Sequence, residues 1–132
     1  MANTAERFRA AVEREGIDAA RELLAEDIVF HSPVTFHPFV GRDTVMALLT
    51  LVSQTFEDFR YTDELAGDGT HALIFKANLA GRELEGIDLL RFDEHGLVDD
   101  FTVMLRPLSG LVPFAQIMGE KAAAAGVETT RS

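Results

Sequence analysis

The segment from Leu84 to Phe92 sets one carboxyl group among apolar neighbours. Alternate residues of a strand share a face, so the even-numbered positions of this segment form one side. Besides Asp88, that side consists of Leu84, Gly86, Leu90 and Phe92. A buried carboxyl group without a partner stays protonated or acquires a donor, and in its neutral form it can donate or shuttle a proton. Asp88 is therefore our first candidate catalytic residue.

A structural interpretation of Asp88 is also open. The strand register could differ by one residue, or the carboxylate could pair with Arg91, with Arg106 or with a backbone amide. Perturbed carboxyl groups gather at functional sites, but structural ion pairs perturb them as well.

Histidine supplies the second kind of candidate, because its imidazole exchanges protons near neutral pH. His37 lies in a loop flanked by prolines and could act as an acid or base toward a ligand, so it is the second catalytic candidate. His31 should alternate onto the sheet surface, whereas His71 and His95 adjoin turns and should be solvated. A metal site through His31 and His37 would need further ligands, and no His, Asp or Glu at close spacing supplies them. We expect no metal and no cofactor.

The helices that must position these groups have recognisable ends. Thr4 can cap a first helix that ends at Gly16, and a second short helix follows. Gly41 leads into a third helix with an apolar stripe. Ser109 can cap a last helix, interrupted at Gly119, whose Phe114 and Met118 would line the mouth of a cone-shaped sheet.

The strands lie between and after these helices. Residues 27–32 predict a first strand with Phe30 and Ser32 on one face, and residues 33–40 predict a loop. Four more strand-length segments follow: Glu57 to Leu65, His71 to Ala80, Arg82 to Asp93 and Leu97 to Pro107. Short glycine-containing turns separate them, so neighbours should be antiparallel. In the first of these four segments, Tyr61 shares a face with Phe59. Its side chain either offers a hydroxyl group to a pocket or packs against its neighbours.

This order predicts an α+β domain in which helices pack on the concave face of a curved antiparallel sheet. A strongly twisted sheet can curl into a cone, and such a cone holds an apolar cavity. We expect one domain over residues 1–125 and a frayed tail over residues 126–132.

The amino-acid composition disfavours several classes of binding partner. The net charge of −10 over 132 residues disfavours nucleic acid and anionic membranes. The absence of cysteine excludes disulfides and thiolate chemistry. The first residues lack the apolar core of a secretory signal, and no apolar run approaches the roughly 20 residues of a membrane span, so a cytoplasmic location is expected.

Five pieces of the chain, spread over residues 6–118, carry a family resemblance. They are Arg7-Phe8, Gly16-Ile17-Asp18, the run from Leu24 to Val34, Gly41-Arg42 and the run from Gly86 to Gly96. Their order resembles the nuclear transport factor 2-like superfamily, specifically its SnoaL-like and ketosteroid isomerase-like members. The resemblance implies a cone-shaped α+β barrel with an apolar pocket, commonly dimeric through the sheet, and it places the loop of His37 near the cavity mouth.

The resemblance transfers residue by residue with a mixed result. Asp88 falls where ketosteroid isomerases keep a protonated oxyanion-hole aspartate. Ser32 stands where they have the catalytic base, and Phe8 stands where they have the second oxyanion donor. Val103 lies near the position of a carboxylate in the epoxide hydrolase relatives. Steroid isomerisation by the mechanism of that family is therefore not expected.

Three functions are carried forward. The first is a SnoaL-like protein that binds a hydrophobic or polycyclic ligand in the cavity with Asp88 as polar anchor or acid, as an isomerase, cyclase or hydrolase. The expected ligand-binding residues are Phe8, Phe30, Ser32, Tyr61, Phe114 and Met118. The second is a non-catalytic ligand-binding or dimerisation module, and the third is an adaptor that uses the exposed sheet face. Because that face carries Val29, Ile87 and Leu89 among charges, we expect a homodimer.

Overall fold

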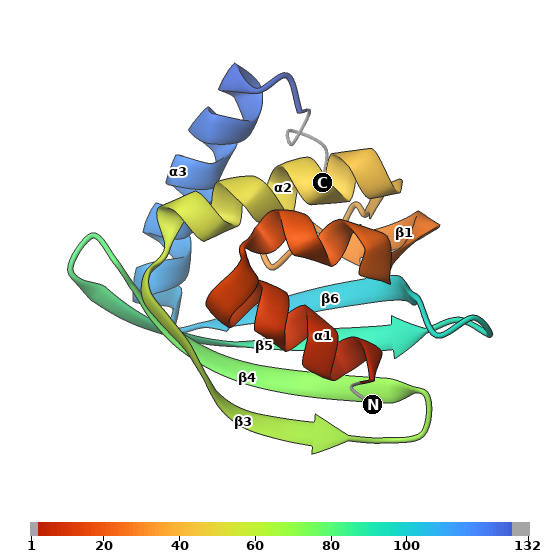
Figure 1. Ribbon diagram of the computed structural model, residues 1–132. Helices are drawn as coiled ribbons and strands as arrows, with labels where there is room; N and C mark the ends of the chain where they lie inside the picture. Colours follow the sequence, from red (N-terminus) through yellow and green to blue (C-terminus); the bar gives the residue numbers. More distant parts are fainter. Residues whose placement is uncertain (1–2, 128–132) are drawn as a thin grey trace.

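A curved six-stranded sheet in the order β2-β1-β6-β5-β4-β3 forms the body of the computed structural model, which describes residues 3–127 (Figure 1). Its strands are β1 (Leu24–His31), β2 (Phe39–Val40), β3 (Glu57–Ala66), β4 (Thr70–Leu79), β5 (Arg82–Phe92) and β6 (Val98–Arg106). The helical segments are α1 (Thr4–Ala10), the π-helical turn η1 (Ala11–Glu15), the 3-10 helix η2 (Ile17–Leu23), α2 (Arg42–Thr55) and α3 (Leu108–Ala124). The α+β class and the four-strand meander are confirmed.

The sheet is mixed, which corrects the expectation of a wholly antiparallel one. Strands β3 to β6 pair antiparallel with their neighbours, as their short turns require. Strand β1 pairs parallel with β6, with Phe30 opposite Phe101. No short turn sets the direction of this pair, because α2 and the rest of the meander separate the two strands in sequence. The predicted loop over residues 33–40 ends in the short strand β2, which pairs antiparallel with β1.

The two predicted caps also differ in the structure. Asn3, not Thr4, caps α1, since its side-chain oxygen accepts the backbone N–H of Glu6 at 2.8 Å. The hydroxyl group of Thr4 instead donates to the carbonyl of Gly96, which ties α1 to the turn between β5 and β6. Ser109 lies inside the first turn of α3 and makes no capping bond.

Helix α3 continues through Gly119, where an interruption was predicted. Beyond that residue Ala122 is fully buried, and the ammonium group of Lys121 donates to the hydroxyl of Thr55 on α2 at 2.8 Å. These contacts fix the last turns of α3 against α2, and they offset the weak helix propensity of glycine.

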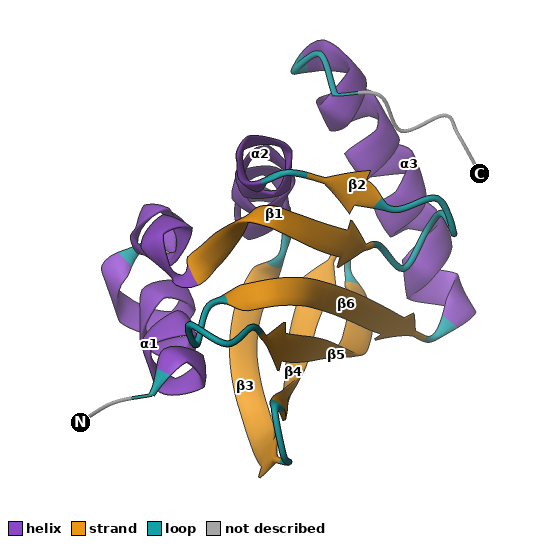
Figure 2. Ribbon diagram, turned by 90° about the vertical axis from the view of Figure 1, so that its right-hand side faces the viewer, coloured by secondary structure: helices purple, strands orange, loops and turns teal. Residues whose placement is uncertain are grey.

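The helices enclose the concave side of the sheet (Figure 2). The N-terminal helical segments and α2 pack over this side, while α3 contacts α2 and the strands β4, β5 and β6. Register shifts in the pairing of β3 with β4, on both sides of Tyr61, mark β-bulges that increase the twist of the sheet. Phe8, Phe75 and Phe101 are fully buried between the two layers.

The domain prediction ended at residue 125, and residues 128–132 of the predicted tail lie outside the described part of the chain. Within residues 3–127 no helix is long and apolar enough to cross a membrane.

Gly86 gives a test of the packing between strands. It pairs with Phe75, and a Cβ atom added to Gly86 would collide with the Phe75 ring and lie 2.5 Å from the carbonyl oxygen of Met104. Gly86→Ala should therefore lower the free energy of unfolding by about 1–3 kcal/mol in urea titrations. Gly119→Ala is the control, because a Cβ there meets nothing within 4 Å and alanine favours the helix. Equal stability of the two variants would contradict this account.

Candidate functional site

A cavity of about 510 Å³ lies between the concave face of the sheet and the helices. Its wall is mostly aromatic and aliphatic, and the residues come from every helical segment and every strand of the described structure and from the loop after β1. The cavity has the size and apolar character of a site for a small organic molecule.

The cavity wall contains every residue that the sequence predicted for ligand binding. Phe8 comes from α1, Phe30 from β1, Ser32 from the loop after it and Tyr61 from β3, while Phe114 and Met118 come from α3. Asp88 of β5 joins them in the wall. Residues from distant parts of the chain thus surround one space.

Asp88 sits on the apolar side of β5, as the alternation predicts. Leu84 and Leu90 on the same side are 2% and 0% exposed, and the whole Asp88 residue is only 7% exposed. In the sheet Asp88 faces Leu73 of β4 and Val103 of β6, neither of which offers a side-chain donor. The strand register that exposes Asp88 to the cavity is therefore the expected one.

Tyr61 is the partner of this carboxyl group. Its hydroxyl group donates to Oδ2 of Asp88 at 2.8 Å, so the side chain spans from β3 across β4 to β5. The arginines considered as alternative partners bond elsewhere: Arg106 to Glu85 at 3.0 Å and Arg91 to Thr70 at 3.3 Å. Among the described residues, no donor contacts the other oxygen, Oδ1.

Burial controls the protonation of both groups. Desolvation raises the pKa of Asp88 from 3.8 to about 7, although the hydrogen bond from Tyr61 acts in the opposite direction. Burial, followed by the charge of Asp88, raises the pKa of Tyr61 well above its usual value. Below about pH 7 Asp88 is therefore a neutral acid, with Oδ1 free to donate to a ligand, while Tyr61 keeps its proton.

Glu13 brings a second carboxyl group to the cavity, and sequence reasoning missed it. It lies on η1, its side chain is 28% exposed, and its Oε1 accepts a hydrogen bond from Nε of Arg9 at 3.0 Å. In the sequence Glu13 stands four residues after Arg9, a spacing that predicts an ion pair on a helix surface. No α-helical spacing places it beside the wall residues Phe8 and Val12, so the local pattern gave no signal for its position at the cavity.

Arg9 connects Glu13 to the Asp88 pair. Its guanidinium group lies 5.6 Å from the centre of the Tyr61 ring, in the position of a cation–π contact. It also donates to Oε1 of Glu64 at 2.9 Å. Glu64 is held in turn by His71 at 2.8 Å, so the network joins α1 to β3 and β4.

The histidines do not join the cavity. His37 is exposed and absent from the cavity wall, although Val34 and Thr35 of the same loop contribute to it. His31 pairs with Asp100 at 3.1 Å outside the cavity. His71 is 6% exposed, which corrects its prediction as a solvated residue, because it faces inward at the start of β4 and bonds Glu64. Residues 3–127 contain no group of three His, Asp or Glu side chains placed to hold a metal ion.

Comparison with known proteins gives one family match. The model of the SnoaL-like domain matches residues 5–101. A search of curated proteins finds no match.

Solved structures share the whole fold. A steroid delta-isomerase from Pseudomonas aeruginosa has 39% sequence identity and a TM-score of 0.87, with 92% of this chain and 90% of that one covered. An uncharacterised bacterial protein with a cystatin-like fold from Silicibacter pomeroyi DSS-3 has 30% identity and a TM-score of 0.88, with 93% and 87% covered. A de novo designed protein with a curved β-sheet reaches a TM-score of 0.73 at 8% identity, with 92% and 93% covered. The last likeness concerns the fold alone.

The protonation of Asp88 predicts a pH-dependent stability. Folding raises its pKa, so the protonated group stabilises the folded state at low pH, and this contribution is lost as the pH rises from 3.8 to about 7. The loss is on the order of 4 kcal/mol. Asp88→Asn keeps an acceptor for Tyr61 but cannot ionise, so it should melt above the wild type at pH 8 and show a smaller advantage at pH 5, where only part of the wild type's loss has occurred.

The control is Asp68→Asn in the exposed turn between β3 and β4. Its melting temperature relative to the wild type should be the same at pH 5 and pH 8. A large loss of stability in Asp88→Asn at pH 8 would mean that the folded protein requires the charged carboxylate.

Proposed function

Because the chain belongs to the SnoaL-like family of the nuclear transport factor 2-like superfamily, we propose that its cavity binds an apolar, polycyclic small molecule with a carbonyl oxygen. The oxygen accepts a hydrogen bond from Asp88, and the apolar body of the ligand contacts the aromatic wall. The observation that carries this proposal is the buried acid Asp88, which accepts a hydrogen bond from Tyr61 in the mostly apolar wall of a cavity of about 510 Å³.

An acid in this position also suits catalysis. A hydrogen bond from protonated Asp88 would strengthen as negative charge develops on the carbonyl oxygen, which is how an isomerase, cyclase or hydrolase of this fold would use it. The steroid delta-isomerase from Pseudomonas aeruginosa supports a polycyclic ketone as the ligand class. The ketosteroid isomerase mechanism is not part of the proposal, because Ser32 and Phe8 replace its base and its phenol.

Two probe ligands of similar shape test the role of Asp88. The first probe, 2-acetonaphthone, has a carbonyl group that can accept a hydrogen bond. The second, 2-ethylnaphthalene, has no hydrogen-bond acceptor. The affinity for 2-acetonaphthone should fall by about tenfold between pH 5.5 and pH 8.5, since ionised Asp88 can no longer donate. The affinity for 2-ethylnaphthalene should fall less over the same pH range, because this probe loses no hydrogen bond. Fluorescence titration measures both affinities.

Asp88→Leu is the matched variant for this experiment. It should bind both probes with equal pH dependence, because the acid is gone while the aromatic wall remains. Equal pH profiles of the two probes on the wild type would argue against Asp88 as the anchor. Binding without turnover of any carbonyl compound would favour the non-catalytic module.

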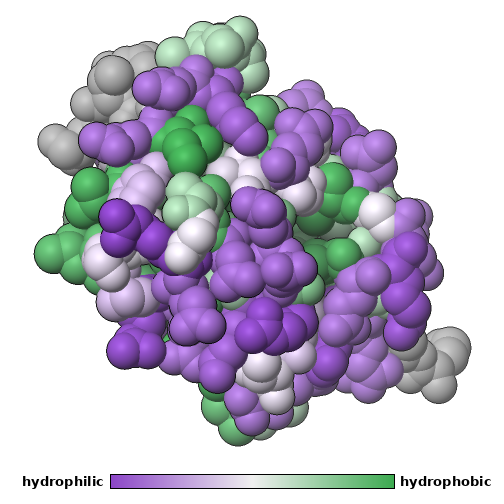
Figure 3. All heavy atoms as spheres, turned by 90° about the vertical axis from the view of Figure 1, so that its left-hand side faces the viewer, coloured by the Kyte–Doolittle hydropathy of each residue, from purple (hydrophilic) through white to green (hydrophobic). Residues whose placement is uncertain are grey.

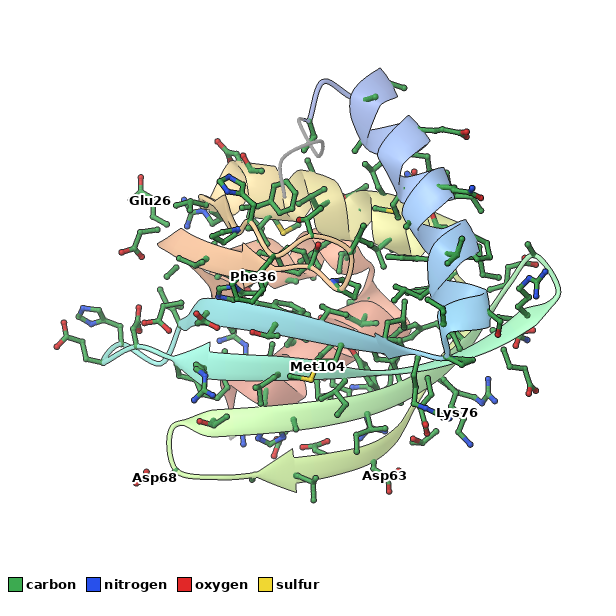
Figure 4. All side chains as sticks on the ribbon, turned by 180° about the vertical axis from the view of Figure 1, so that it is seen from behind. Glu26, Phe36, Asp63, Asp68, Lys76 and Met104 are labelled. Carbon is green, nitrogen blue, oxygen red and sulfur yellow. The ribbon has the colours of Figure 1, made fainter. Side chains whose placement is uncertain are left out.

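We also propose that a second copy of the chain covers the outer face of the sheet. Phe36 and Met104 are 97% and 52% exposed there, on the side away from the N-terminal helices (Figure 4). Both border a shallow depression that also includes His31 and Leu105. In the view of Figure 3, by contrast, hydrophobic groups form separate patches in a mostly hydrophilic surface. The two large apolar side chains make the outer face the better candidate for a symmetric contact.

Met104→Asp tests this interface. The charge should shift sedimentation at micromolar concentration from dimer toward monomer without lowering the melting temperature of the monomer. Leu65→Asp is the control, since Leu65 is 61% exposed on the edge strand β3, away from the depression. A monomeric wild type would remove the proposal.

A further inference from the structure

The cavity holds two carboxyl groups in unlike surroundings. Asp88 is buried on β5 with Tyr61 as its partner, whereas Glu13 stands on η1 in an ion pair with Arg9 and is 28% exposed. Within the cavity wall as the structure describes it, these are the two acidic side chains. Among the described residues, no hydrogen bond joins the two carboxyl groups, because each bonds a partner of its own.

We propose that Glu13 is the general base of this cavity, working against Asp88 as the acid, and that the substrate is a ketone with an acidic C–H bond next to its carbonyl group. This inference rests on the proposed function, because it requires that Asp88 holds the carbonyl oxygen. It goes beyond it by assigning the proton-accepting group and the reaction class. One carboxyl group that burial keeps neutral and a second that is held in an ion pair supply the acid and the base that this reaction class requires.

Three observations place Glu13 in this role. Glu13 lines the same cavity as Asp88, and its charge is one of the causes of the raised pKa of Tyr61, the hydrogen-bond partner of Asp88. The bond from Arg9 occupies Oε1, and among the described residues no donor contacts Oε2. Arg9 itself is held by Glu64 and by the Tyr61 ring, which limits the movement of Glu13.

The π-helical turn is the fourth observation. Such turns are rare and frequently occur at functional sites, and here the turn ends at Gly16, whose φ of 105° other residues rarely adopt. The wider turn changes the direction of the side chains that follow α1. Glu13 therefore reaches the cavity from a segment whose charges otherwise face solvent.

The proton transfer balances without a further reactant. The C–H bond next to the carbonyl breaks, its proton passes to Oε2 of Glu13, and its electron pair forms the C=C bond of an enol. The carbonyl oxygen takes the proton from Oδ1 of Asp88. In the reverse direction the enol carbon takes back a proton from Glu13, which its partial exposure allows to exchange with solvent.

Hydrogen–deuterium exchange of 2-tetralone, an apolar bicyclic ketone, measures this step directly. In D₂O at pD 6, where Asp88 is protonated, the wild type should accelerate the loss of the C1 proton signal over buffer. Glu13→Gln should slow the protein-catalysed exchange by about 100-fold or more, because the amide cannot accept the proton. Its affinity for 2-tetralone should stay close to that of the wild type.

Glu15→Gln is the matched control. Glu15 lies on the same π-helical turn but not in the cavity wall, so this variant should exchange at the wild-type rate. Glu13→Asp, which retracts the carboxylate by one methylene group, should fall between the wild type and Glu13→Gln. This graded series separates loss of the base from a general disturbance of the turn.

The remaining outcomes overturn the inference. If Glu13→Gln exchanges 2-tetralone as fast as the wild type, Glu13 is not the base. If the wild type binds 2-tetralone but does not accelerate exchange, the acid–base pair fails while ligand binding stands. If the wild type binds neither 2-tetralone nor 2-acetonaphthone, the proposed function itself fails, and the role of Glu13 fails with it.

Discussion

The carboxyl group of Asp88 lies in a mostly apolar cavity, where Tyr61 is its hydrogen-bond partner among the described residues, and this burial is the constraint on which the site depends. An ionised carboxylate loses its hydration there, and the single hydrogen bond from Tyr61 replaces only part of it. The protein therefore keeps the group neutral up to about pH 7. A neutral acid is also the form that can donate to a ligand, so the cost to stability and the chemical use of Asp88 have one origin.

The sheet must be strongly curved for this arrangement to exist. Tyr61 reaches Asp88 only because β3, β4 and β5 bend toward the helices, and the register shifts on both sides of Tyr61 lie where that bend is needed. Gly86 makes room for the Phe75 ring between these strands. The de novo designed protein with a curved β-sheet shares this fold at 8% sequence identity, so the fold by itself does not fix which residues form the wall. The identities of a few wall residues, and not the curvature alone, distinguish this cavity.

The two carboxyl groups of the cavity wall differ in their exposure to water. Asp88 is 7% exposed at the sheet, whereas the Glu13 side chain is 28% exposed on the helical side. Arg9 lies over the Tyr61 ring and donates to Glu13, so a positive charge stands beside one carboxyl group, while desolvation raises the pKa of the other. The cavity wall thus holds one carboxyl group in an ion pair and one that burial keeps neutral below about pH 7.

Local patterns alone were enough to predict much of this protein. The alternation along residues 84–92 placed Asp88 on the apolar side, and the glycine turns defined the four-strand meander, because side-chain period and turn chemistry are properties of neighbouring residues. The family resemblance added the wall residues Phe8 and Ser32. Tertiary structure decided what depends on distant segments. These are the parallel pairing of β1 with β6, the bond between Tyr61 and Asp88, the burial of His71, the absence of His37 from the wall and the approach of Glu13. Each depends on how whole elements pack against one another, and the local pattern around a residue does not show which elements will meet there.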